Sequence, residues 1–91
     1  MPYIDQHRRD QVEPAIKALA EEIGCVGDAE IDGVMNYVIS TLVQRVYYPG
    51  QPRYTTMQRV AGLLACVQLE HYRRVAAPYE DAKEREPGRV W

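Results

Sequence analysis

Tyrosine and arginine side chains in the C-terminal half of this sequence have the chemistry needed to bind a small anionic molecule. Tyr72, Arg73 and Arg74 are consecutive, and Tyr79 follows directly after a proline. A tyrosine ring offers a face for stacking, and a guanidinium group can bind a phosphate through two parallel hydrogen bonds. Together with two earlier residues of suitable chemistry, the expected ligand-binding set is Asn36, Tyr37, Tyr72, Arg73, Arg74 and Tyr79.

Consecutive residues of a helix point in different directions, because each residue turns the helix by about 100°. Residues 72–74 therefore cannot all face one pocket within a single subunit. A site formed between subunits could use all three. The plainer interpretation is that the arginines only form ion pairs with acidic neighbours.

No residue spacing in the chain fits a catalytic site. Glu21-Glu22 begins the magnesium-binding motif of the all-α nucleotide pyrophosphatases, but Cys25 stands where the third carboxylate is needed. Glu30 and Asp32 are two residues apart and do not share a helix face. The chain also lacks a glycine-rich phosphate loop, a nucleophile elbow and an HExxH motif. We expect a non-enzymatic protein with no cofactor and no metal ion.

Composition restricts the class of protein. A chain of 91 residues forms one domain with a small core, and a net charge of −2 gives no general attraction to nucleic acid. Seven tyrosines and no phenylalanine favour half-buried positions at interfaces or pockets, or around a small core. No signal peptide or membrane-spanning run is visible, so we expect a cytoplasmic protein with no membrane contact and reduced thiols.

Helical spacing of apolar residues predicts an all-α fold with three main helices in a small bundle. The first apolar stripe runs from Val12 to Ile23, with Pro14 in a first turn and Gly24 as a stop. Asp5 is expected to cap a separate short helix before this stripe. The second helix should begin after an N-cap at Asp28 and fade by Tyr48. The third should open at Thr55, with Gln58 completing a capping box.

The third predicted helix is apolar on nearly every side in its first half. Val60, Leu64 and Val67 occupy one side with His71 as a core histidine, whereas Gly62, Cys66 and Leu69 lie on the other. A helix that is apolar all round is buried on more than one side. We therefore expect a homo-oligomer built on this helix.

The C-terminal part is predicted to be a kinked extension. Pro78 should interrupt the third helix, because the residue before a proline is steered away from helical geometry. Residues 87–91 form a tail whose Trp91 should dock on protein, and residues 1–11 form an arm or a short helix. The expected domain is a single one over residues 1–91.

Several segments together resemble a small uncharacterised domain common in phages and prokaryotes. They are the MPYI start, the run GVMNYVIS at 33–40, YRRV at 72–75, and APYED at 77–81 with Lys83. The resemblance implies a fold and a phage-like context but no established activity. The chain departs from that pattern at Ala65, where glutamate is usual, at His71, which replaces an aromatic residue, and in its PGRVW ending. Because the carboxylate at position 65 is missing, the hypothesis of an acidic binding site is further disfavoured.

Three functions remain open from the sequence. The first is a phage-type oligomer that binds or sequesters an anionic small molecule such as a signalling nucleotide, in the host cytoplasm if phage-encoded. The second is a protein-interaction module, an inhibitor or adaptor of a host or phage protein, using the face of Gly33, Tyr37 and Ser40 or the docked tail. The third is a purely structural helical oligomer.

Overall fold

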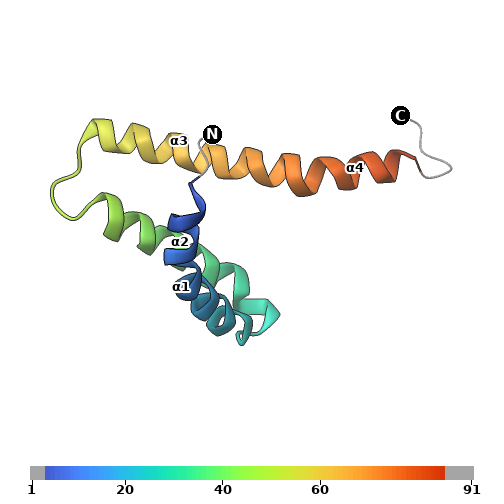
Figure 1. Ribbon diagram of the computed structural model, residues 1–91, viewed down its shortest axis with the longest axis horizontal. Coiled ribbons are helices and arrows are strands. Elements are labelled where there is room, and N and C mark those ends of the chain that lie inside the picture. The colour runs from blue at the N-terminus through green and yellow to red at the C-terminus, as the bar shows by residue number, and fades with distance from the viewer. Residues whose placement is uncertain (1–3, 86–91) are drawn as a thin grey trace. The chain divides into compact units, whose positions relative to one another are not determined.

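The computed structural model describes residues 4–85, which are helical apart from the N-terminal two residues, the connections and the final turn (Figure 1). The helices are α1 (Gln6–Gly24), α2 (Asp28–Tyr47), α3 (Tyr54–His71), a π-helical segment η1 (Tyr72–Ala76) and α4 (Ala77–Glu84). The described residues contain no strand, so the predicted all-α class with three main helices is confirmed. The chain divides into two compact units, Met1–Gln51 and Pro52–Trp91.

The first unit is a hairpin of α1 and α2. Asp5 caps α1, because its side-chain oxygen accepts a hydrogen bond of 2.9 Å from the backbone N–H of Arg8. The expected place of Pro14 in a first turn is wrong, since it lies inside α1. Pro14 has no backbone N–H, so the carbonyl of Asp10 lacks its usual hydrogen-bond donor. The helix nevertheless continues on both sides of the proline.

Helix α2 begins one residue earlier than the predicted cap at Asp28 implies. Gly27 is the N-cap and makes no side-chain hydrogen bond, so Asp28 lies in the first turn together with Glu30. Both carboxylates still face the positive end of the helix dipole. The helix ends at Tyr47 with Tyr48 as its C-cap, as the following Pro49-Gly50 pair predicts.

The second unit is one nearly continuous run of helix. Helix α3 starts at Tyr54 after Arg53, without a side-chain cap, so the predicted capping box of Thr55 and Gln58 is wrong. Pro78 does not break the run either. Ala77 keeps helical angles (φ −63°, ψ −46°), and the backbone passes through η1 directly into α4.

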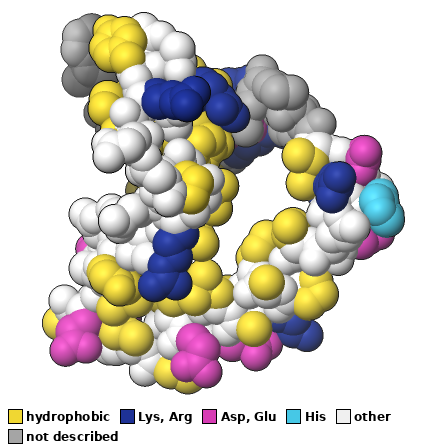
Figure 2. All heavy atoms as spheres, turned by 90° about the vertical axis from the view of Figure 1, so that its left-hand side faces the viewer, with side chains coloured by type: hydrophobic (Ala, Val, Ile, Leu, Met, Phe, Trp, Pro, Cys, Tyr) yellow, Lys and Arg dark blue, Asp and Glu magenta, His cyan; other side chains and the backbone are white. Residues whose placement is uncertain are grey.

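Burial is slight throughout the described residues. Among residues 4–85, Val60 alone is buried, with 8% of its surface exposed, while Leu64 and Val67 expose 44% and 53%. His71 is exposed rather than a core residue, because the apolar side on which it lies is incompletely covered. Hydrophobic side chains are accordingly widespread on the surface shown in Figure 2.

Other expectations fall outside what the structure describes. The tail at 87–91, with Trp91, and the first three residues of the N-terminal arm lie outside residues 4–85. The single-domain assignment stays a prediction. Within the described part of the chain, no helix has the length and apolar content needed to cross a membrane.

Candidate functional site

An apolar groove lies between α1 and α2. Its volume is about 450 Å³. We call it the hairpin groove, and its lining residues are Ile16, Leu19, Ala20, Ile23, Gly24, Ile31, Met35, Val38, Ile39 and Leu42. No charged side chain contributes to this lining. The groove thus presents apolar surface of the kind that normally lies against other protein.

Burial along the hairpin explains why the groove is open. Next to the connection, Ile23 and Ile31 are half-buried. Farther away, Ile16 exposes 53% of its surface on α1 and Leu42 exposes 52% on α2. The apolar stripes of α1 and α2 therefore pack against each other near the connection. Toward the opposite end of the hairpin, both stripes remain exposed.

Of the predicted ligand-binding residues on α2, Asn36 adjoins this groove and Tyr37 does not. Asn36 lines a neighbouring hollow with Asp32 and Ser40, and this hollow shares Met35 and Ile39 with the hairpin groove. The Ser40 hydroxyl donates to Oδ1 of Asn36 over 3.2 Å. Tyr37 lines neither hollow and is 67% exposed.

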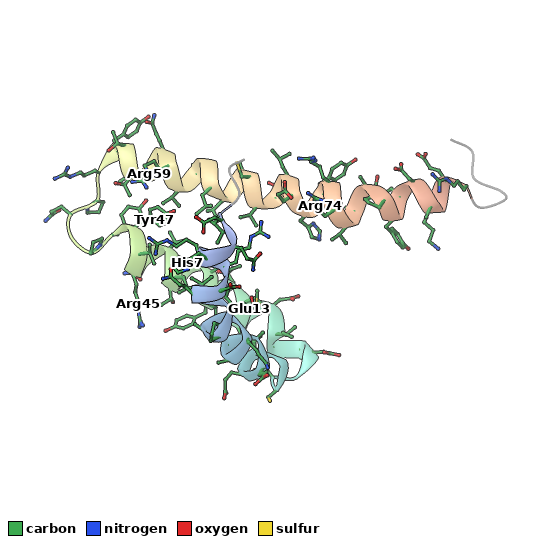
Figure 3. The ribbon with its side chains drawn as sticks, viewed as in Figure 1. His7, Glu13, Arg45, Tyr47, Arg59 and Arg74 are labelled. Carbon is green, nitrogen blue, oxygen red and sulfur yellow. The ribbon has the colours of Figure 1, made fainter. Side chains whose placement is uncertain are left out.

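The two predicted arginines share one carboxylate. Arg73 Nη1 lies 3.5 Å from one oxygen of Glu70, and Arg74 Nε lies 3.4 Å from the other. Their side chains are 68% and 67% exposed, whereas that of Glu70 is 21% exposed. Figure 3 shows Arg74 projecting from the helical run where α3 passes into α4. Surface pairs of this length contribute little to stability.

The remaining predicted residues lie on the same helical run. Tyr72 begins η1 and is 51% exposed, and Tyr79 lies in α4 and is 61% exposed. The ammonium group of Lys83 sits 5.5 Å from the centre of the Tyr79 ring. Tyr72, Arg73 and Arg74 are therefore brought together on one short segment, whereas Asn36 and Tyr37 belong to the other unit.

The described residues contain no cluster of His, Cys, Asp or Glu that could hold a metal ion. Cys25 and Cys66 both carry free thiols, with Cys25 exposed at the end of α1 and Cys66 half-buried in α3. The π-helical backbone of η1 widens the helix where both arginines lie. Such segments occur often at functional sites, although here a following proline supplies a structural cause.

The hairpin groove was not predicted as a site. Its signal was present in the sequence as two apolar stripes, on residues 12–23 and 31–46. Those stripes indicate a buried core in a closed bundle. What the pattern could not reveal is that the two helices leave most of that apolar surface uncovered.

Comparison with protein families gives one match. The model of a family described as "Domain of unknown function (DUF6899)" matches residues 1–90. No curated protein and no solved structure matches the chain.

Proposed function

The chain belongs to this DUF6899 family, and we propose that it is a protein-interaction module whose hairpin groove binds an apolar helix. The observation that carries the proposal is the uncharged lining of the groove, combined with the exposure of Ile16, Ile39 and Leu42. Amphipathic helices commonly bind in grooves of this kind, with side chains at three- and four-residue spacing as anchors.

The size of the groove suits a helix. It is lined along α2 from Ile31 to Leu42, which at 1.5 Å per residue corresponds to about 17 Å, or three helical turns. Three turns present about three to four apolar side chains on one face. A bound helix would cover the apolar residues that α1 and α2 do not cover for each other.

The acidic charge of the hairpin favours a basic binding partner. Residues 13–32, which include the closed end of the hairpin, carry six acidic side chains and one lysine. Charge complementarity of this kind favours encounter with a basic helix and disfavours an acidic one. In the phage-like context that the resemblance implies, the module would act as an adaptor or inhibitor in the host cytoplasm.

A fluorescently labelled designed peptide tests this function. The probe is a basic amphipathic helix with leucine at three- and four-residue spacing, and the measurement is fluorescence anisotropy at low chain concentration. We expect saturable binding that Ile39→Glu abolishes, because a charge would be buried against leucine. Tyr37→Glu adds the same charge to α2 outside the groove and should bind like the unaltered chain. Equal binding by both variants, or none by the unaltered chain, would reject the proposal.

A second function is favoured by the shared carboxylate of the arginines. Glu70, near the end of α3, pairs with Arg73 and Arg74 of the π-helical segment η1, and Tyr72 adds an exposed ring. An anion such as a nucleotide phosphate would compete with Glu70 for the guanidinium groups. This second candidate function is the binding or sequestration of a signalling nucleotide, which was the first of the functions left open by the sequence.

Thermal-shift measurements separate the two functions. If the anion candidate is correct, mono-, di- or cyclic nucleotides raise the melting temperature of the unaltered chain and of Ile39→Glu alike. The double variant Arg73→Gln with Arg74→Gln loses the shift. An absence of any shift across these nucleotides removes the anion candidate and leaves the groove proposal untouched.

A further inference from the structure

We propose that the hollow beside the hairpin groove binds one arginine side chain of the bound helix and so fixes the position of that helix along α2. The proposal rests on the proposed function of the groove and adds a specificity-determining contact to it. The hollow has a volume of about 390 Å³. We call it the polar hollow, and its lining residues are Asp32, Met35, Asn36, Ile39 and Ser40.

The three polar residues of the polar hollow form a row along α2. Asp32, Asn36 and Ser40 follow one another at four-residue spacing, so they lie on one face of the helix. At 1.5 Å per residue, the row is about 12 Å long. Each of the three side chains contributes oxygen atoms that accept hydrogen bonds, and the carboxylate carries a negative charge. The row is therefore suited to a cationic donor.

The hydrogen bond within the row leaves acceptors available to a ligand. The Ser40 hydroxyl donates its hydrogen to Oδ1 of Asn36, so toward a ligand its oxygen acts as an acceptor. The amide oxygen of Asn36 has a second lone pair for a further donor. Among residues 4–85, the Asp32 carboxylate takes part in no hydrogen bond or ion pair. A basic side chain of a bound helix would be its first charged partner.

Two apolar residues join the polar hollow to the hairpin groove. Met35 and Ile39 line both, and they expose 40% and 45% of their surface. Long basic side chains lay their methylene groups on apolar surface while the charged end reaches polar partners. An arginine beside the leucine positions of a bound helix can therefore lie over these two residues. Its guanidinium group then meets Asp32 and Asn36.

Arginine suits this row better than lysine does. The guanidinium group has five donors in a planar fork, so it can bind a carboxylate with two parallel hydrogen bonds and keep donors for a neighbouring oxygen. A lysine ammonium group is a more compact and more strongly hydrated charge. An acidic side chain is disfavoured at the same place, because residues 13–32 carry six acidic side chains and one lysine.

Mutant cycles between chain and peptide test the polar hollow. The probe is the designed peptide with arginine as its basic residue, each arginine is replaced in turn by glutamine, and fluorescence anisotropy measures binding. We expect one replacement to weaken binding to the unaltered chain by about ten-fold, because a charge-assisted pair is lost. In Asp32→Asn the same replacement should have no further effect. Glu30→Gln removes an equal charge from α2 outside both hollows and should preserve the ten-fold effect.

Exchange of the charges gives an independent measurement. Asp32→Lys should weaken binding of the arginine peptide, and glutamate at the identified peptide position should restore it. Lysine at that peptide position should bind the unaltered chain more weakly than arginine, because the paired hydrogen bonds are lost. Asp32 is exposed, so neither of its substitutions disturbs the packing of the hairpin.

The contrary outcomes separate this contact from the proposed function. If every arginine replacement affects the unaltered chain and Asp32→Asn equally, the attraction is a general charge effect and the polar hollow binds no particular side chain. If the peptide nevertheless binds and Ile39→Glu abolishes that binding, the proposed function stands without this contact. A peptide that does not bind the unaltered chain rejects the proposed function, and the contact with it.

Discussion

The backbone N–H of Ala77 donates its hydrogen bond to the carbonyl of Tyr72, five residues earlier rather than the usual four. The next residue is Pro78, which has no N–H and whose ring would collide with the carbonyl of Arg74 in a regular α-helix. The widened turn gives that ring room. It therefore explains how a proline lies within the helical run of the second unit, and why Arg73 and Arg74 occupy a π-helical segment.

Replacing the proline should remove the reason for the wide turn. In Pro78→Ala the missing N–H is restored and the ring is gone, so we expect η1 to become regular α-helix. Helix-interior proline costs up to about 3 kcal/mol, and we expect the free energy of unfolding to rise by about 1 kcal/mol because the wide turn already relieves part of that cost. Urea denaturation followed by circular dichroism measures the change. A fall in stability would mean that the π-helical turn is held by contacts other than the proline.

The cap of α1 should contribute measurably to the stability of the hairpin. Asp5→Ala removes the acceptor for the backbone N–H of Arg8, and loss of such a cap costs about 1 kcal/mol. Equilibrium denaturation in urea measures the loss. Glu13→Ala, in the middle of the same helix, is the matched control and should change stability by less than about 0.5 kcal/mol. Equal effects of the two substitutions would contradict the capping role.

The shared carboxylate of the arginines predicts opposite effects on stability and anion binding. In Glu70→Gln we expect a loss of less than about 1 kcal/mol in unfolding free energy, because Arg73 and Arg74 are mostly solvent-exposed. The loss should shrink in about 1 M salt, where surface charges are screened. If the segment binds anions, the same substitution removes the competing carboxylate and should tighten nucleotide binding, measured by calorimetry. Weaker binding in Glu70→Gln would contradict that competition.

Local signals in the sequence predicted the helices better than they predicted the surfaces between helices. Asp5 as a cap and the fading of α2 by Tyr48 are confirmed. Each depends on residues within a few positions of one another. Pro14 and Pro78 were wrongly predicted to mark helix boundaries, because their local cost is outweighed by the helix on both sides.

Features that depend on packing could not be read from periodicity. The stripe of Ile16 on α1 and that of Leu42 on α2 have the same pattern whether they face each other closely or leave an open groove. His71 shares the helical spacing of Val60, yet only Val60 is buried among the described residues. The predicted ligand residues Asn36 and Tyr72 lie in different units, and spacing along the sequence contains no information on their separation.

Disulfide cross-linking tests the binding of a helix in the hairpin groove most directly. The chain for this measurement has Cys25→Ser and Cys66→Ser, with Ile39→Cys in the groove, and the designed basic peptide carries one cysteine among its leucine positions. Tyr37→Cys in place of Ile39→Cys is the control outside the groove. The proposal predicts that mild oxidation joins the peptide to the Ile39→Cys chain but not to the control chain, and that reduction releases it. Equal cross-linking of both chains, or none with Ile39→Cys, would contradict binding in the groove.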